Sequence, residues 1–207
     1  MENRWLTSAK RLQGIASTGL HYARDEFDKE RYAEVASIAN DMLALLGNVP
    51  VTRIRDLVPD FAKGYATPKV EVRGAVIENQ KVLLVKEVAD GLWALPGGFA
   101  DVGLSPGENV VKEIREEASL TVSANAVYGI RHKARHEYDP DTRDFYKILF
   151  LCETIGTSNP QPGPEVTDAA FFGLDELPPL STSRILEKDI VAAFTFKDDP
   201  QRLSLFD

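Results

Sequence analysis

Three glutamates stand at helical spacing within residues 95–120, the part of this 207-residue chain whose residue types could form a chemical site. Glu113, Glu116 and Glu117 occupy positions i, i+3 and i+4, so a helix is expected to bring their carboxylates together on the side away from its apolar stripe. Like charges at this spacing repel each other, and a hard divalent cation with a preference for oxygen ligands relieves the repulsion. The spacing indicates either a metal site or a solvated acidic face, and the solvated face is the more frequent use of such a run.

The turn before this helix favours the metal site. Gly97 and Gly98 let the backbone approach a neighbour closely and leave a carbonyl, that of Gly97, free to bind a metal. The helix itself has a well-marked beginning. Ser105 is a suitable N-cap, Pro106 suits the first helical position, and Glu108 completes a capping box. A glycine turn, a loop and a carboxylate-bearing helix together predict a site.

The same residues resemble the box of the Nudix family, Gly-x5-Glu-x7-Arg-Glu-U-x-Glu-Glu-x-Gly-U, where U is aliphatic. Six of its nine specified positions match: Gly98, Glu113, Ile114, Glu116, Glu117 and Leu120. Leu104, Lys112 and Ser119 stand where the family has Glu, Arg and Gly. In the family that Glu and Arg pair to brace the loop against the helix. Leu104 and Lys112 are therefore either a compensated pair, in which Leu104 braces the loop by apolar packing, or a sign that the site has decayed.

The resemblance implies an α+β fold, the Nudix α/β/α sandwich with a mixed sheet, preceded by a small helical domain. The flanking segments WALPGG and AAFFGLDELPPLS also look like those of the family. The N-terminal helices look like those of a bacterial branch that includes CDP-choline and ADP-ribose pyrophosphatases. The linker GYATPKV predicts a helical N-terminal domain over residues 1–65 and a Nudix hydrolase domain over residues 66–207.

Apolar periodicity predicts the remaining elements. The N-terminal part is expected to hold a helix over residues 2–23, a second helix capped by Asp28 and ended by Gly47, and a short third helix after Thr52. Two long helices with one apolar face each must pack on something, and the candidates are each other, the second domain or a second copy of the chain. The rest predicts three strands before the box with a turn at residues 78–80, then strands at 120–131 and 143–154, a short strand opened by Phe171, and a last helix over 183–194.

The resemblance implies Mg²⁺ or Mn²⁺ held by Glu113 and Glu117 directly, by Glu116 directly or through water, and by the carbonyl of Gly97. It implies hydrolysis of a pyrophosphate bond with a carboxylate as general base. One of the three helix glutamates could take this role, because carboxylates that share a site raise one another's proton affinity. Glu165, in the loop GPEVTD, is the other candidate base, and a solvated loop residue is an equal alternative.

Contacts to the substrate are predicted from basic residues. Arg131, Lys133 and His136 belong to a local basic cluster in an acidic protein, which suits a diphosphate. The alternative for each is a solvated strand end. Arg73 lies on a strand that leads to the box, where it either binds phosphate or points to solvent.

Composition limits the partners. The net charge of −8 argues against general binding to nucleic acid or to an anionic membrane, since neither attracts an acidic chain. No apolar run reaches the length of a membrane span, and the N-terminus lacks the core of a signal peptide. The single cysteine, Cys152, lies in the apolar run FYKILFLCE and is expected to be a buried strand residue. A lone cysteine suits a reducing compartment, and we expect a cytoplasmic location.

Two functions of different classes remain open. The first is a metal-dependent pyrophosphohydrolase that acts on a nucleoside diphosphate linked to another group, of the CDP-choline or ADP-ribose type, and releases a nucleoside monophosphate. The second is a catalytically weakened Nudix-derived nucleotide-binding or regulatory module, suggested by Leu104, Lys112 and Ser119. The N-terminal helices offer no basic recognition face for DNA, which counts against a regulator. A homodimer through these helices is expected in either case.

Overall fold

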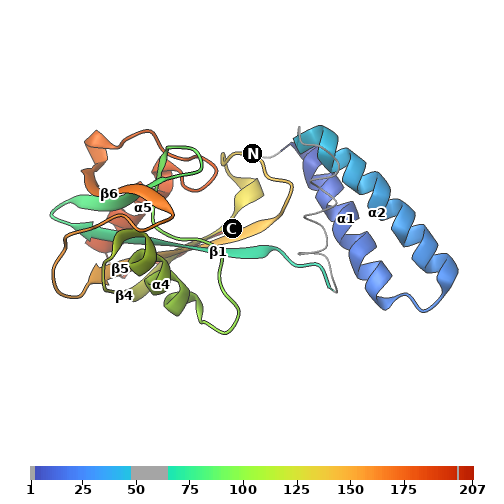
Figure 1. Cartoon of the computed structure of the whole chain (residues 1–207), viewed down its shortest axis with the longest axis horizontal. Helices are drawn as coiled ribbons and strands as arrows, with labels where there is room; N and C mark the ends of the chain where they lie inside the picture. Colours follow the sequence, from blue (N-terminus) through green and yellow to red (C-terminus); the bar gives the residue numbers. More distant parts are fainter. Residues whose placement is uncertain (1–2, 48–64, 200) are drawn as a thin grey trace. The chain divides into compact units, whose positions relative to one another are not determined.

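The computed structural model describes residues 3–47, 65–199 and 201–207. The chain divides into two compact units. The helical unit takes the residues up to Lys69 together with Ala134–Phe145, and the sheet unit takes Val70–Lys133 and Tyr146–Asp207. Each unit has its own elements, which Figure 1 labels. The predicted boundary near residue 66 stays a prediction, because the segment just before Tyr65 lies outside the described residues.

The helical unit is built on α1 (Arg4–Tyr22) and α2 (Glu26–Gly47), which pack together around Leu6, Ala9 and Leu43. A Cβ added at Gly19 would lie 2.4 Å from the ring of Tyr32, so glycine lets the two helices approach at this point. The prediction that Asp28 caps α2 was wrong by one turn. Asp25 accepts the N–H of Phe27 at 3.2 Å, so the helix begins earlier. The third helix, predicted after Thr52, falls outside the described residues.

The sheet unit holds a mixed sheet whose strand order is β3-β2-β1-β5-β4-β7, with β6 pairing with β2. β7 runs parallel to β4, whereas β1, β3 and β6 are antiparallel to β2. The strands are β1 (Lys69–Glu78), β2 (Lys81–Glu87), β3 (Trp93–Ala94), β4 (Val122–His132), β5 (Phe145–Thr154), β6 (Val166–Gly173) and β7 (Leu205–Phe206). The turn predicted between β1 and β2 is confirmed, with Asn79 and Gln80 in the left-handed region at φ 48° and 59°.

Side chains alternate along the strands and fill two apolar cores, one on each face of the sheet. On one face Val72 and Val76 of β1 join Ile114 of helix α4 (Pro106–Ala118). On the other, Ala75 and its neighbours join Ile190 of helix α5 (Glu187–Asp198). Figure 1 shows α4 in front of the sheet and α5 behind it. The predicted sandwich is confirmed.

In the sheet unit, two elements begin four or five residues away from the predicted position. β6 begins at Val166, five residues before Phe171, because Val166 is buried and the strand pairs along nearly all of β2. α5 begins at Glu187 and not at residue 183. The preceding residues form a turn in which the N–H of Arg184 donates to Ser181 O at 2.8 Å, and the Asp189 carboxylate accepts the N–H of Leu186. Among the described helices, none combines the length and the apolar character that crossing a membrane requires.

Candidate active site

Helix α4 carries the box glutamates, and its ends are set by local chemistry. The capping box is confirmed: Ser105 Oγ accepts the N–H of Glu108 at 3.2 Å, and Glu108 Oε2 accepts the N–H of Ser105 at 2.7 Å. At the other end Ser119 takes a left-handed conformation, with φ 56° and ψ 24°, and its N–H donates to Arg115 O. Glycine is the residue that adopts this conformation without cost, which explains the family's preference there.

Glu117 is buried, with only 5% of its surface exposed, and its carboxylate accepts the N–H of Gly97 at 2.8 Å. This corrects the expectation that it faces away from the apolar stripe. Glu117 stands seven residues after Val110 and three after Ile114, so it shares their face of the helix. Burial raises the pKa of Glu117 to about 7, while the positive charge of Arg73 and the Gly97 N–H oppose the rise.

Glu113 and Glu116 take different positions. A Cβ built at Gly98 would lie 3.0 Å from Glu113 Oε2, so the Glu113 carboxylate rests against the glycine turn. Glu116 is exposed and pairs with Lys112 at 3.1 Å. In the described part of the chain no three His, Cys, Asp or Glu side chains form a ready-made metal cage. The structure therefore brings Glu113 and Glu117 to the turn and leaves Glu116 on the outer side.

The glycine turn is fixed against β1 by its backbone. The N–H of Val72 donates to Gly98 O and the N–H of Gly74 donates to Pro96 O, both at 2.9 Å. Gly97 has φ 145°, and a Cβ there would lie 2.1 Å from Val72 O, so no other residue fits. The turn that the sequence predicted to expose a backbone carbonyl is thus a rigid part of the sheet unit.

Arg73 does not point to solvent, and its contacts are those of a buried brace. Only 4% of it is exposed; its Nε donates to Glu71 at 2.7 Å, and one guanidinium nitrogen donates to Leu95 O at 2.9 Å. Glu71 also pairs with the fully buried Lys147 at 2.6 Å. Burial lowers the pKa of Lys147 to about 8. Sequence reasoning missed Lys147, although charged residues inside apolar strands are a signal for buried ion pairs.

Glu165 lies two residues after Gly163, whose N–H donates to Glu117 O at 3.0 Å. Its charge is near enough to Glu113 to add to the rise of the Glu113 pKa, which burial causes in the first place. Glu165 itself is exposed, and its backbone O accepts the N–H of Val88 at 3.4 Å. The loop therefore carries a carboxylate to the same place as the turn and α4.

The predicted basic cluster is not gathered at this place. Arg131 points to acidic residues near the C-terminus, with ion-pair distances of 3.5 Å to Asp189 and 3.7 Å to Asp207. Lys133 is buried in the sheet unit, near enough to Lys147 to lower its pKa further. His136 belongs to the helical unit, where its ring contacts Tyr138.

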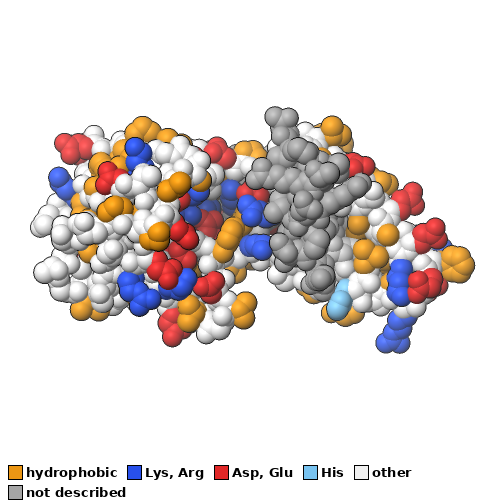
Figure 2. All heavy atoms as spheres, in the orientation of Figure 1, with side chains coloured by type: hydrophobic (Ala, Val, Ile, Leu, Met, Phe, Trp, Pro, Cys, Tyr) orange, Lys and Arg blue, Asp and Glu red, His pale blue; other side chains and the backbone are white. Residues whose placement is uncertain are grey.

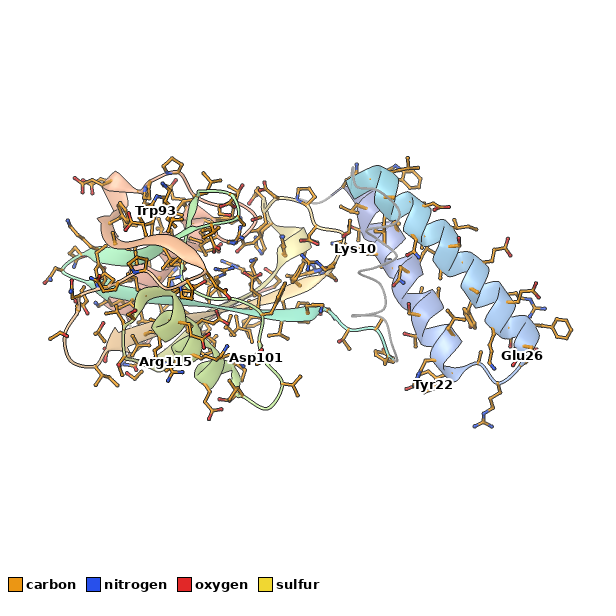
Figure 3. The ribbon with its side chains drawn as sticks, in the orientation of Figure 1. Lys10, Tyr22, Glu26, Trp93, Asp101 and Arg115 are labelled. Carbon is orange, nitrogen blue, oxygen red and sulfur yellow. The ribbon has the colours of Figure 1, made fainter. Side chains whose placement is uncertain are left out.

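The loop before α4 is braced by charge and by an amide, which corrects the expectation for Leu104. Lys112 pairs with Asp101 at 3.0 Å, so the acid of the brace stands at 101 instead of 104. The buried Asn109 accepts the N–H of Asp101 at 2.8 Å and donates to Leu104 O. Leu104 itself is 40% exposed. Figure 3 shows Asp101 in the loop beside the helix that carries Arg115.

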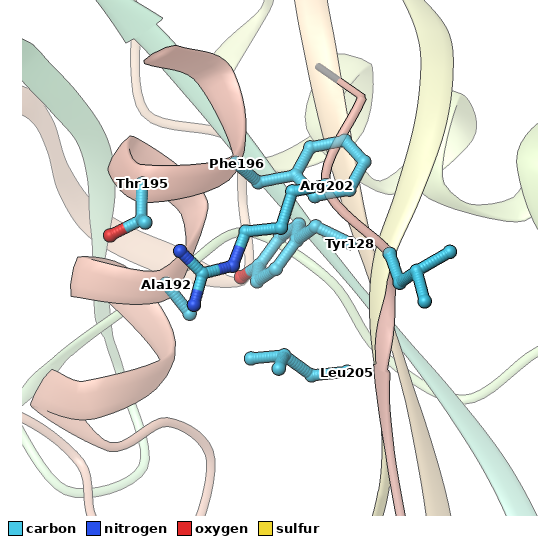
Figure 4. A pocket seen from close by; sticks show the side chains of 7 residues that line it. Tyr128, Ala192, Thr195, Phe196, Arg202 and Leu205 are labelled. Carbon is cyan, nitrogen blue, oxygen red and sulfur yellow. The ribbon is translucent and has the colours of Figure 1, made fainter. Parts of the chain in front are cut away.

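A small hollow of about 50 Å³ lies elsewhere in the sheet unit, between α5 and β7, and Figure 4 shows it. Tyr128, Phe196 and Arg202 line it, together with aliphatic side chains. None of the predicted site residues reaches it, so it is no part of the candidate site. On the face drawn in Figure 2, acidic and basic side chains adjoin one another on the sheet unit.

Comparison with known proteins identifies the family of the chain. A family model described as the NUDIX domain matches residues 68–194. A second, described as a UDP-X-like N-terminal oligomerisation domain, matches residues 3–58. The chain belongs to the Nudix family. It is a Nudix hydrolase, an enzyme that cleaves pyrophosphate bonds.

Three relatives illustrate the likeness. The Bacillus subtilis (strain 168) protein YjhB, described as a candidate ADP-ribose pyrophosphatase, is 38% identical over 207 residues, which cover 100% of this chain and 99% of YjhB. The crystal structure of a Streptococcus suis ADP-ribose pyrophosphatase is 38% identical with a TM-score of 0.62, covering 68% of this Nudix hydrolase and all of that chain. The crystal structure of a UDP-X diphosphatase is 30% identical with a TM-score of 0.63, covering 98% of both chains.

Proposed function

We propose that this Nudix hydrolase cleaves the diphosphate of a nucleoside diphosphate linked to another group and releases a nucleoside monophosphate. The observation that carries the proposal is the buried carboxylate of Glu117, docked on the N–H of Gly97 beside the Glu113 carboxylate. Two carboxylates, a rigid glycine turn and Glu165 form a site for a hard cation and a water. A surface that merely binds nucleotide does not need a carboxylate buried at such cost.

The donor set fits a divalent metal. Nudix hydrolases in general use divalent metals. Glu117 is buried without a full counter-charge, as its raised pKa reflects, and a cation supplies that charge. Glu113, Glu117 and the Gly97 carbonyl would hold Mg²⁺ or Mn²⁺, whereas Glu116, which pairs with Lys112 on the outer side of the helix, stays a predicted ligand without a supporting contact. When bound, the ion neutralises diphosphate charge and lowers the pKa of a water.

The residues around the metal position are assigned the other roles of the reaction: general base, support of the glycine turn and contact with the substrate. We assign Glu165 as the general base that accepts a proton from the attacking water, because it is near Glu113 and exposed. Arg73 holds Leu95 O and so keeps the turn in place, which replaces its predicted contact with phosphate. For the substrate anion, we keep Lys133 as a proposed contact, supported by its place near Lys147, whereas Arg131 and His136 remain predictions without a supporting contact.

The substrate is best sought among three classes. The two solved relatives act on ADP-ribose and on UDP-linked compounds according to their descriptions, and the resemblance adds CDP-choline. We place ADP-ribose first, because relatives of that description match at 38% identity. The test is release of nucleoside monophosphate from ADP-ribose, a UDP-sugar and CDP-choline, each with and without Mg²⁺. Absence of Mg²⁺-dependent release from every member of the panel would favour the weakened binding module.

We also propose that the enzyme is a homodimer that works in the cytoplasm. The dimer is supported by the match of residues 3–58 to an oligomerisation domain and by exposed apolar side chains on both helices of the helical unit. The location rests on the single cysteine, Cys152, which is buried and whose thiol has its pKa raised to about 12 by burial. This thiol is therefore a packing group and not a nucleophile.

A further inference from the structure

A proline-rich segment runs from Pro160 to Pro164 just before Glu165, with the sequence Pro-Gln-Pro-Gly-Pro. Proline has no N–H, so Gln161 and Gly163 are the two residues of this segment that can donate from the backbone. Both donate to the end of α4: Gln161 N–H to Ala118 O at 2.9 Å, and Gly163 N–H to Glu117 O at 3.0 Å. Carbonyls in the last turn of a helix lack partners within the helix, so these two bonds satisfy them.

Gly163 touches the helix more closely than any side chain allows. A Cβ built on it would lie 1.7 Å from Glu116 O and 2.9 Å from the carbonyl carbon of Glu116. Both groups are backbone, so no rotation of a side chain relieves the contact. Gly163 is not among the residues with positive φ. Glycine is therefore required at this position for space and not for backbone conformation.

The other end of the segment is anchored in the sheet. Val166 begins β6 and is 5% exposed within the core beneath α4. Its N–H donates to Gly163 O at 3.4 Å, and Glu165 O accepts from Val88 at 3.4 Å. Prolines on alternate positions restrict the backbone between these anchors. Glu165 thus sits one residue from the core and two residues from a contact with the helix that carries Glu113 and Glu117.

We propose that residues 160–164 form a strut that positions Glu165 against α4, and that Gly163 is the positioning residue of this strut. The proposal rests on the proposed function, in which Glu165 is the general base. The physical reason is that the base and the carboxylates it serves lie on different segments. Backbone bonds from the strut to Glu117 and Ala118 make the two segments move as one. Gly163 itself touches no substrate.

A purely structural role makes a different prediction. If the strut only caps α4, a Cβ added at Gly163 lowers the stability of the fold. Turnover then falls only because a smaller fraction of the enzyme is folded. If the strut positions Glu165, the loss appears in kcat and depends on Glu165 being present. The two roles are separated by kinetics in the presence and absence of the carboxylate at position 165.

The experiment uses Gly163→Ala in the full chain, with ADP-ribose and Mg²⁺ as the probe. We expect kcat to fall by about 100-fold, as for a displaced catalytic group, and KM to change by less than about threefold. Gly107→Ala is the matched control, because a Cβ at Gly107 would make only an ordinary contact of 3.8 Å with Ala124, and its kcat should stay at the wild-type value. Mn²⁺ affinity, measured by electron paramagnetic resonance, shows which side of the 1.7 Å contact gives way. It should be the same in both variants if the strut moves and α4 keeps its place, whereas a loss in Gly163→Ala alone would mean that the ligands on α4 have moved and would overturn the proposal.

A double-mutant cycle decides the outcome. In a Glu165→Gln background, adding Gly163→Ala should cost almost nothing more in kcat, whereas additive losses would overturn the strut. Full turnover in Glu165→Gln itself would overturn the proposed base, and the strut with it. Gln161→Pro removes the other backbone donor, the N–H of Gln161, without adding a Cβ at position 163. If Gly163→Ala does not fold, Gln161→Pro replaces it in the same double-mutant cycle with Glu165→Gln. A wild-type kcat in both strut variants would also overturn the proposal.

Discussion

Glu117 meets two opposed demands, since its carboxylate is buried for function and burial disfavours its charge. The raised pKa, about 7 in the folded chain against 4.5 in the reference state, means that the protonated form is the one that suits the metal-free fold. Its favourable contribution is fully present below pH 4.5 and is lost as the pH rises through about 7. The charged Glu117 carboxylate should therefore destabilise the fold of the metal-free enzyme at pH 7 and above.

Glu117→Gln should separate these demands. Glutamine keeps the volume and can still accept the N–H of Gly97, so at pH 8 without metal we expect the variant to be more stable than wild type by up to about 3 kcal/mol. At pH 4 the difference should nearly vanish. Turnover should fall by at least about 100-fold, because a ligand charge is gone. Urea melts at both pH values, with added Mg²⁺ as a third condition, measure this. Equal stabilisation of both proteins by Mg²⁺ would contradict the assigned site.

At the residue scale the sequence indicated the chemistry better than the geometry. Glu113, Glu117 and Glu165 were identified from spacing and loop position; the structure brings Glu113 and Glu117 to the glycine turn, and the role of Glu165 stays a prediction. The outward direction of Glu117 was wrong, because spacing among glutamates was weighed above spacing to Val110 and Ile114. The buried role of Arg73 could not be predicted in full, since Glu87 and Leu95 O become its neighbours only when β2 and the glycine turn after β3 dock against β1.

At the scale of elements, the end of α4 offers a direct test of backbone strain. Ser119 has a left-handed backbone conformation, which costs a residue with a Cβ more free energy than it costs glycine. We expect Ser119→Gly to raise the free energy of unfolding by about 0.5–1 kcal/mol, with no change in kcat. Chemical denaturation gives the first value and ADP-ribose turnover the second. An unchanged or lower stability would show that the exposed Ser119 side chain offsets its strain.

The loop before α4 gives a second test, of where its brace stands. Asp101→Ala should lower stability by about 0.2–1 kcal/mol, as for an exposed ion pair. Adding Leu104→Glu should restore part of the loss, because Leu104 lines the same shallow hollow as Lys112 and Arg115. Leu104→Glu alone should cost less than about 1 kcal/mol, since Leu104 is already 40% exposed. Additive effects in thermal melts of the two singles and the double would show that position 104 cannot replace Asp101.

Elements were predictable where a local signal defines them. The capping box of Ser105 and Glu108 and the turn at Asn79 and Gln80 depend on neighbours in sequence, and both are confirmed. The first residues of β6 and of α5 depend on distant partners and were misplaced. β7 was missed, because two residues are too few to show a period and its pairing with Gly129 of β4 is long-range.

At the scale of the whole molecule, the sheet unit has far larger apolar cores than the described part of the helical unit, whose cluster is built on Leu6, Ala9 and Leu43. The sheet unit closes two cores around one sheet. In the helical unit large apolar side chains remain exposed on both helices: Trp5, Ile15, Tyr22, Phe27, Ile38 and Leu45. Leu45 is 83% exposed, and a helix of an isolated domain rarely exposes so many large apolar side chains together. The sequence predicted this need for a partner from the two apolar stripes, without showing which face remains open.

The last prediction is that a second copy of the chain covers this open face. Light scattering at micromolar concentration should give twice the 22.9 kDa of one chain. Ile15→Glu places a charge among the exposed apolar side chains of α1 and should shift the enzyme to a monomer at the same concentration, because burying an unpaired carboxylate opposes association. Leu203→Glu, at an 85% exposed leucine of the sheet unit, is the control and should leave the dimer intact. A monodisperse wild-type monomer would contradict the dimer, and a dimer that persists in Ile15→Glu would move the interface away from this face of α1.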